Sequence, residues 1–316
     1  MPVHPQAQAV LDAFASMGLP PFETMSLEES RQVIESIRNF MVPVEEVAST
    51  EDFAIPGPHG DIGLRVYRPE GEGLLPCVFY FHGGGFSTGS VDMVDPICRL
   101  LANRSGCMVI SVDYRLAPEN PYPAAVTDAY VAISWVGAYG QGFGVDPSRL
   151  AVAGDSAGAT IATAACMLIR DKNVGEPEIK IQYLLCPVTD LVKFETPSYQ
   201  EFGEGYLLTT AMMRAWKDQY LRGCEEGTYY EPYCSPVREQ NLANLPPAII
   251  VTAEYDPLRD EGEAYGQLLM INGVMSEVRR EEGMIHEFIW FGGTIDRGRE
   301  LLEEVGSDLR KILFIG

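Results

Sequence analysis

Apolar residues from about residue 51 onward fall into two kinds of pattern, short continuous runs and longer stretches with helical spacing. The short runs predict strands buried on both faces, and they occupy residues 61–69, 75–82, 107–114, 150–154, 181–187 and 248–254. The helical patterns between and after them lie at residues 123–140, 157–171, 259–273 and 298–313. This alternation predicts βαβ units and a mostly parallel central sheet, with functional groups at the carboxyl ends of the strands.

Two segments depart from the alternation. The first fifty residues have helical patterns at 6–18 and 26–41, and the second pattern begins with Ser26 and Glu29 at capping-box spacing. Residues 188–222 are rich in aromatic side chains and methionine and contain one predicted helix, at 209–221. We therefore expect an α/β core made of residues 51–187 and 223–316, with residues 1–50 and 188–222 as helical additions.

The composition restricts the possible partners. A formal net charge of −22 over 316 residues repels phosphate backbones and anionic lipids, which argues against nucleic-acid binding and electrostatic membrane docking. No apolar run reaches the roughly 18 residues of a membrane span, and no secretory leader is visible, so we expect a cytoplasmic protein without membrane insertion. Seven cysteines without a C-x-x-C pair are typical of buried free thiols, and four widely separated histidines argue against a histidine-built metal site.

The pentapeptide GDSAG at residues 154–158 matches the pattern G-x-S-x-G. It lies between a predicted strand and a predicted helix, which is the context of a nucleophile elbow. Small neighbours allow the tight turn, and the hydroxyl of Ser156 then projects above the sheet. The pentapeptide alone is also compatible with a glycine-rich turn in which Ser156 caps the helix. The choice between them depends on partner residues.

A serine nucleophile needs a base, usually histidine, and the base is oriented by a carboxylate. His286 lies in a predicted loop before the last helix, and Asp256 follows the strand-like run 248–254. Three neighbouring carboxylates compete with Asp256, although a solvated position or a helix N-terminal charge explains them more simply: Glu254, Asp260 and Glu261. The order Ser156, Asp256, His286 is the one found in α/β-hydrolases.

Three glycines follow His82 directly after the predicted strand 75–82. No lysine follows them as in a P-loop, and the G-x-G-x-x-G spacing is absent, so a phosphate loop is not predicted. Consecutive glycines allow backbone N–H groups to point inward, as an oxyanion hole requires. We predict Gly83 and Gly84 as donors, joined by the N–H of Ala157, and we interpret His82 as an organiser of the loop.

Taken together, the motifs resemble those of the hormone-sensitive-lipase-type carboxylesterases, the bacterial family IV esterases of the α/β-hydrolase fold. The resemblance covers about residues 50–315 and is carried by HGGGF at 82–86, DYRLAPE at 113–119, GDSAG at 154–158, DPLRDEGEAY at 256–265 and the histidine of GMIHEF at 283–288. It implies an eight-stranded, mostly parallel sheet flanked by helices. It also implies ester hydrolysis through an acyl-enzyme, with Ser156, Asp256 and His286 as the triad and no metal or organic cofactor.

The resemblance also implies that residues 1–50 and 188–222 form a helical cap over the active site. A confined pocket under such a cap favours small esters with short to medium acyl chains. Hydrolysis of amides by the same triad and a non-catalytic receptor role are the alternatives. A homodimer through the predicted edge strand 276–282 is one possibility, and the charge of that strand argues equally for a monomer.

The chain departs from the common family pattern at two positions. Ala159 replaces a glycine just inside the helix, which is a small change, and Glu287 replaces a glycine after the histidine. A positive φ at residue 287 would strain a glutamate. Without that strain, its carboxylate could stabilise protonated His286 and shift the acidic limb of activity to higher pH. We state this as a hypothesis.

Overall fold

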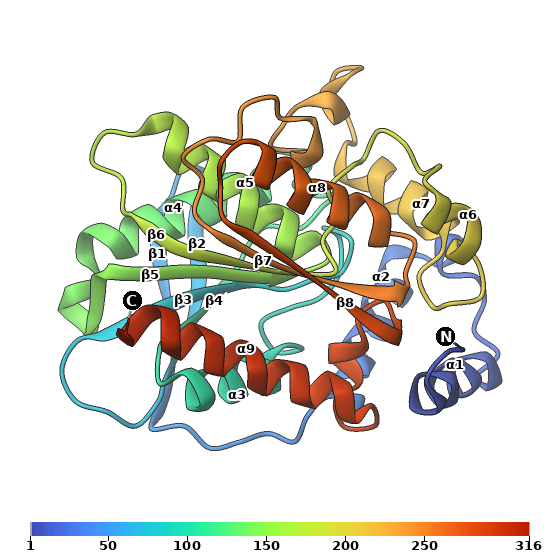
Figure 1. Ribbon diagram of the computed structural model, residues 1–316, viewed down its shortest axis with the longest axis horizontal. Helices are drawn as coiled ribbons and strands as arrows, with labels where there is room; N and C mark the ends of the chain where they lie inside the picture. The colour runs from blue at the N-terminus through green and yellow to red at the C-terminus, as the bar shows by residue number, and fades with distance from the viewer. Residues whose placement is uncertain (1, 316) are drawn as a thin grey trace.

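The computed structural model describes residues 2–315 and contains one central sheet (Figure 1). Its strand order is β1-β2-β4-β3-β5-β6-β7-β8, with β2 antiparallel to both of its neighbours and all other pairs parallel. The strands are β1 (Ser49–Gly57), β2 (Gly60–Arg68), β3 (Leu75–Phe81), β4 (Met108–Asp113), β5 (Val145–Asp155), β6 (Ile179–Leu185), β7 (Ala248–Tyr255) and β8 (Ser276–Ile285). The predicted mostly parallel, eight-stranded sheet is confirmed.

Helices cover both faces of the sheet (Figure 1). Helices α3 and α9 pack against each other on one face, and α4, α5 and α8 lie on the other. Within residues 2–315 the α-helices are α1 (Pro5–Ser16), α2 (Leu27–Ser36), α3 (Asp95–Ser105), α4 (Ala124–Tyr139), α5 (Ala157–Lys172), α6 (Pro197–Phe202), α7 (Thr210–Tyr220), α8 (Arg259–Ile271) and α9 (Asp296–Ile315).

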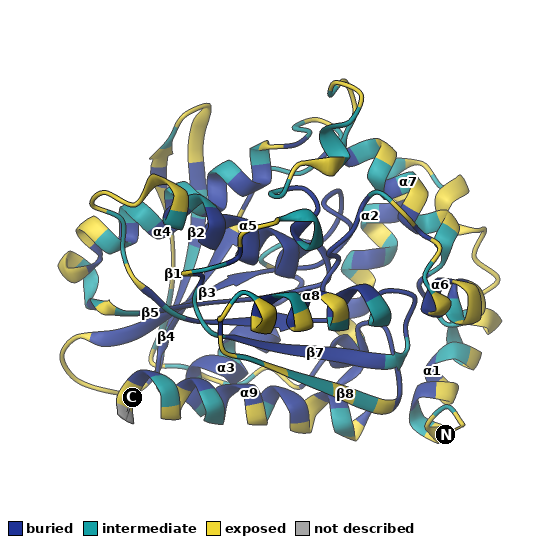
Figure 2. Ribbon diagram, turned by 45° about the horizontal axis from the view of Figure 1, so that its top comes forward, coloured by how far each residue is buried: buried dark blue, intermediate teal, exposed yellow. Residues whose placement is uncertain are grey.

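The apolar runs of the sequence become the core because each central strand is buried on both faces. All residues of β3 are buried, and its side chains divide alternately between two apolar clusters, with Phe79 in one and Tyr80 in the other. The edge strand β8 is different, because its first half carries charged, partly exposed side chains. Figure 2 shows this contrast between the buried centre of the sheet and its exposed edge.

Sequence patterns missed three elements. The segment 188–222 contains two α-helices, α6 and α7, so the expectation of a single helix there is wrong. Helix α6 has only six residues and is capped by Thr196, so it is too short to give a periodic pattern. Strand β1 and helix α3 were also not assigned from the sequence. Proline and charged residues interrupt the apolar spacing of both elements.

Helices α1, α2, α6 and α7 gather at one end of the sheet (right in Figure 1). The guanidinium of Arg31 on α2 donates to both carboxylate oxygens of Glu119 at 2.8 Å and to the carbonyl of Ser87 at 3.0 Å. Arg115 makes a bidentate pair with Asp128 on α4. Glu119 of the DYRLAPE motif thus holds α2 to the core, while Arg115 of the same motif fixes its loop to α4.

Candidate active site

Ser156 occupies the single residue between the end of β5 and the start of α5, in a conformation that only a tight turn imposes. Its φ of 49° and ψ of −118° lie outside the common regions, a strain of about 1–3 kcal/mol. The turn can close because position 158 has no side chain: a Cβ there would lie 2.0 Å from the carbonyl oxygen of Phe81. The backbone N–H of Ser156 donates to Leu185 on β6 at 2.8 Å. This geometry is that of a nucleophile elbow.

The structure brings the three predicted residues together at the carboxyl ends of their strands. His286 follows β8, and its Nε2 lies 3.1 Å from Oγ of Ser156. Its Nδ1 lies 2.7 Å from Oδ2 of Asp256, which follows β7. The other oxygen of Asp256 accepts the backbone N–H of Leu258 at 2.8 Å. This second hydrogen bond holds the Asp256 carboxylate in the position in which it contacts the His286 ring.

This arrangement can move a proton from the serine to the imidazole. Nδ1 donates its hydrogen to the Asp256 carboxylate, so Nε2 is left with the lone pair that accepts the hydrogen of Ser156. All three side chains are buried. Burial strengthens the attraction between a protonated ring and the Asp256 carboxylate, which favours charge separation during attack by the hydroxyl.

The glycine loop requires one correction to the predicted oxyanion donors. The N–H of Gly83 donates to Oδ2 of Asp155 at 2.9 Å, so Gly83 is not available to hold an oxyanion. Within residues 2–315 no acceptor is found for the N–H groups of Gly84, Gly85 or Ala157. Gly85 has a φ of 60°, and a Cβ there would meet the indole of the cap residue Trp216 at 2.1 Å. The free donors are therefore Gly84, Gly85 and Ala157.

Asp155 is the anchor of this loop, a role that the sequence did not reveal. Besides Gly83, its carboxylate accepts the hydroxyl of Tyr80 at 2.6 Å and the indole N–H of Trp290 at 3.0 Å. The side chain is fully buried, and burial raises its pKa. Three converging donors stabilise the charged form and oppose that rise. Asp155 thus links the loop to the segment that follows His286.

His82 packs against the glycine loop and helps to hold its backbone, as expected from the sequence. Its Nδ1 contacts the carbonyl of Gly83 at 2.7 Å, and the hydroxyl of Tyr114 donates to the carbonyl of His82 at 2.6 Å. Burial lowers the pKa of His82 to about 4, so the ring is neutral at physiological pH. No hydrogen bond joins it to Ser156, and it is not a second base.

Glu287 adopts the positive φ that the sequence raised as a possibility, at 54°. Its carboxyl is buried, and Oε1 lies 3.7 Å from Nε2 of His286. Burial, followed by the charges of Asp155 and Asp256, raises the pKa of Glu287 well above its ordinary value. A raised pKa lessens the negative charge that this carboxyl supplies to the ring, which argues against a shift of the acidic limb.

The carboxylates that competed with Asp256 have other partners. Glu261 is buried, not solvated, and one of its oxygens accepts the backbone N–H groups of Thr189 and Asp190 at 2.8 and 3.1 Å. Asp260 accepts the N–H of Ser198 at 2.8 Å. These two residues hold the start of the 188–222 segment and α6 against α8. Only their three-dimensional neighbours reveal this role.

One group of metal-binding residue types coincides with the site. The ligand atoms of Cys186, Asp256 and His286 lie within 4.8 Å of one another. Burial raises the pKa of the Cys186 thiol well above its ordinary value, and a protonated thiol is a poor ligand. Nδ1 of His286 is already bonded to Asp256. The group therefore fits a proton relay better than a metal centre.

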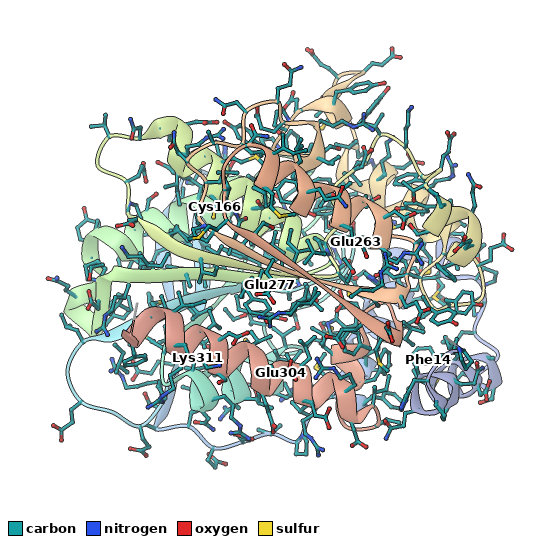
Figure 3. The ribbon with its side chains drawn as sticks, in the orientation of Figure 1. Phe14, Cys166, Glu263, Glu277, Glu304 and Lys311 are labelled. Carbon is teal, nitrogen blue, oxygen red and sulfur yellow. The ribbon has the colours of Figure 1, made fainter. Side chains whose placement is uncertain are left out.

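A cavity of about 470 Å³ opens over Ser156, His286 and Gly84. Its walls come from the helical end of the molecule and are mostly apolar: Leu11, Phe14, Ile34, Ile37, Met212 and Trp216. Phe14 lies on α1 at this end (Figure 3). Tyr220, also in the segment 188–222, serves packing instead, since its ring stacks on that of Phe86 with 3.8 Å between the ring centroids.

Comparisons with known proteins agree with this site. Residues 78–290 match the family described as alpha/beta hydrolase fold. The esterase LipI of Mycobacterium tuberculosis is 41% identical over 86% of this chain and 84% of its own length, and an arylesterase of Saccharolobus solfataricus is 34% identical over 99% of both. The structure of a hyperthermophilic esterase from the archaeon Pyrobaculum calidifontis superposes with a TM-score of 0.91, at 40% identity over 98% of this chain and 99% of that one.

The chain therefore belongs to the α/β-hydrolase family. Within that family it is one of the hormone-sensitive-lipase-type esterases, and its activity is carboxylic ester hydrolysis. The predictions of family, fold and enzyme class are confirmed, which decides against a non-catalytic receptor. Over residues 2–315, none of the helices combines the length and apolar character needed to cross a membrane.

Proposed function

We propose that Ser156, His286 and Asp256 form the catalytic triad of this serine esterase. The observation that carries the proposal is the continuous hydrogen-bonded chain from Oγ of Ser156 through both ring nitrogens of His286 to Asp256. His286 takes the hydroxyl proton as Ser156 attacks the ester carbonyl, and returns it to the leaving alcohol. Water, activated by the same ring, then releases the acid and restores the serine.

We propose Gly84, Gly85 and Ala157 as the oxyanion hole. Their N–H groups come from the loop after β3 and from the start of α5, and they have no acceptor within residues 2–315. Ala157 is the first residue of α5, so the positive end of the helix adds to the field at this point. Donors that are held in place before the reaction stabilise the developing negative charge without reorganisation.

An activated phosphonate ester, which phosphonylates serine nucleophiles with release of its leaving alcohol, tests the triad. We expect stoichiometric loss of activity with one label per chain, found by peptide mass spectrometry on the peptide that contains Ser156. A His286→Ala variant should react far more slowly, because the hydroxyl of Ser156 has lost the base that lies 3.1 Å away in the wild type. Labelling at another serine, or equal labelling rates in both proteins, would contradict the assignment.

For the domain organisation, we propose that residues 1–50 and 188–222 act as a cap on a core formed by 51–187 and 223–316. The support is that α1, α2 and α7 contribute walls of the cavity while α3, α4, α5, α8 and α9 flank the sheet. The two parts of the cap are joined by an edge-to-face contact between Phe22 and Trp216, whose ring centroids are 5.3 Å apart.

We further propose a cytoplasmic enzyme that acts on small esters with short to medium acyl chains. The support is a cavity of about 470 Å³ enclosed by apolar side chains of the cap. A homodimer is compatible with the exposed edge strand β8 and with Met275 just before it, which is 75% exposed. A monomer is equally compatible with the charges of that edge.

A series of p-nitrophenyl esters tests the acyl preference. Each buried CH₂ contributes about 0.8 kcal/mol, or about a fourfold rise in kcat/KM, until the cavity is filled. We expect a maximum between butyrate and octanoate and a steep fall by palmitate. A Met212→Ala variant, which shortens a wall residue, should move the maximum to longer chains. A rate that still rises at palmitate would refute a confined acyl site.

A further inference from the structure

Glu287 combines two unfavourable features that the mechanism above does not use. Its φ of 54° would be relaxed in glycine and is strained in glutamate. Its carboxyl is buried, and within residues 2–315 neither oxygen accepts a hydrogen bond from an N–H or hydroxyl group. A strained residue whose buried carboxyl accepts no such hydrogen bond is unfavourable to keep. That combination, next to His286, points to a function for the side chain.

The surroundings of Glu287 decide its charge. The titratable groups that face it come from four strand ends and one strand: Asp155 at the end of β5, Cys186 after β6, Asp256 after β7, His286 after β8, and Tyr80 on β3. None of these groups is a lysine or arginine. With two carboxylates beside it and its oxygens buried, the side chain keeps its proton. It is therefore a hydrogen-bond donor as well as an acceptor.

Asp155 is the neighbour able to take that proton. A carboxylate has about four lone-pair sites, and the donors found on Asp155 are Tyr80, Gly83 and Trp290. One site remains. The carboxyl of Glu287 also lies within hydrogen-bonding reach of the Asp155 side chain. The alternative acceptor, Nε2 of His286, lies 3.7 Å away and faces the hydroxyl of Ser156.

We propose that Glu287 is a positioning residue, which as a neutral acid donates its proton to Asp155 and so holds the oxyanion loop through the bond between Asp155 and Gly83. This hydrogen bond fixes the Asp155 carboxylate, which in turn binds the N–H of Gly83. Gly84 and Gly85 are the next two residues in the chain, so their positions depend on that of Gly83. Loss of the donor lets Asp155 move and displaces these two N–H groups from the developing oxyanion. This inference rests on the triad and oxyanion hole proposed above.

The test compares Glu287→Gln, which keeps the size and a donor, with Glu287→Leu, which keeps the size and removes every polar atom. Both variants retain the strained φ. With p-nitrophenyl butyrate at neutral pH we expect kcat of the Leu variant to be about tenfold or more below that of the Gln variant, with KM changed less than about twofold. Equal kcat values in the two folded variants would overturn the proposal.

The pH profile of the Gln variant supplies a readout that does not depend on how well the Leu variant folds. A neutral Glu287 leaves the acidic limb of kcat/KM where it is, so the limbs of wild type and Glu287→Gln should coincide within about 0.3 pH units. An ionised Glu287 near the ring would stabilise the imidazolium. Its replacement would then move the limb to lower pH by about one unit or more, and this result would overturn the proposal.

Two further measurements separate this proposal from the function on which it rests. Thermal unfolding identifies a variant that is destabilised, and Glu287→Met replaces Glu287→Leu if the latter does not fold. Phosphonate labelling of Ser156 in the wild type tests the triad itself. Wild type that is labelled and active, combined with equal kcat in the Gln and Leu variants, refutes only the role of Glu287. An unlabelled wild type refutes the triad.

Discussion

Replacement of Ser156 by alanine is expected to lower kcat for p-nitrophenyl acetate by at least about 10⁴-fold. The hydroxyl lies 3.1 Å from Nε2 of His286, and its removal leaves the ring and the oxyanion donors without a nucleophile. The fold should survive, because alanine carries the same Cβ as serine and adds no new strain at this φ of 49°. Initial rates at saturating substrate, with thermal unfolding as the measure of folding, provide the test.

Ser148→Ala is a suitable matched control for this variant. Ser148 lies on the same strand, β5, at the end remote from the site, and among residues 2–315 its hydroxyl bonds only to the nearby Asp146. This control should keep the wild-type rate. A Ser156→Ala protein that is folded and hydrolyses the ester within tenfold of wild type would show that another group attacks the carbonyl.

The elbow and the triad could be predicted from sequence because their signals are local. A G-x-S-x-G pattern after an apolar run fixes the turn at Ser156, and strand ends followed by Asp256 and His286 place their side chains at one edge of a parallel sheet. Each inference needs only the pattern of neighbouring residues. The sheet itself follows from the same apolar runs, whereas a short helix such as α6 has no period to detect.

The oxyanion donors and the state of Glu287 could not be predicted in this way. Whether Gly83 is free depends on a carboxylate 72 residues away, and nothing in the glycine run distinguishes Gly83 from Gly85. The charge of Glu287 depends on burial among residues from other strand ends, and a sequence does not display burial. Long-range hydrogen bonds and desolvation are therefore where the predictions fell short.

The anchoring role of Asp155 leads to the second large effect, a loss of about 10²-fold or more in kcat for Asp155→Ala with a small change in KM. The variant leaves the N–H groups of Gly83 and Trp290 and the hydroxyl of Tyr80 without their acceptor. Three buried donors left unpaired destabilise the fold by about 3 kcal/mol or more. Steady-state kinetics well below the melting temperature separates the catalytic loss from the loss of stability.

Asp155→Asn is the matched control, because its effect follows from the same geometry. One oxygen of Asp155 accepts both Gly83 and Trp290, and the other contacts the hydroxyl of Tyr80. An amide can keep its oxygen on the two N–H groups and turn its nitrogen toward Tyr80, whose oxygen then accepts. The loop stays anchored, so the Asn variant should recover most of the activity that the Ala variant loses. If a folded Ala variant matches wild type, or Asn is no better than Ala, the loop is held by contacts other than Asp155.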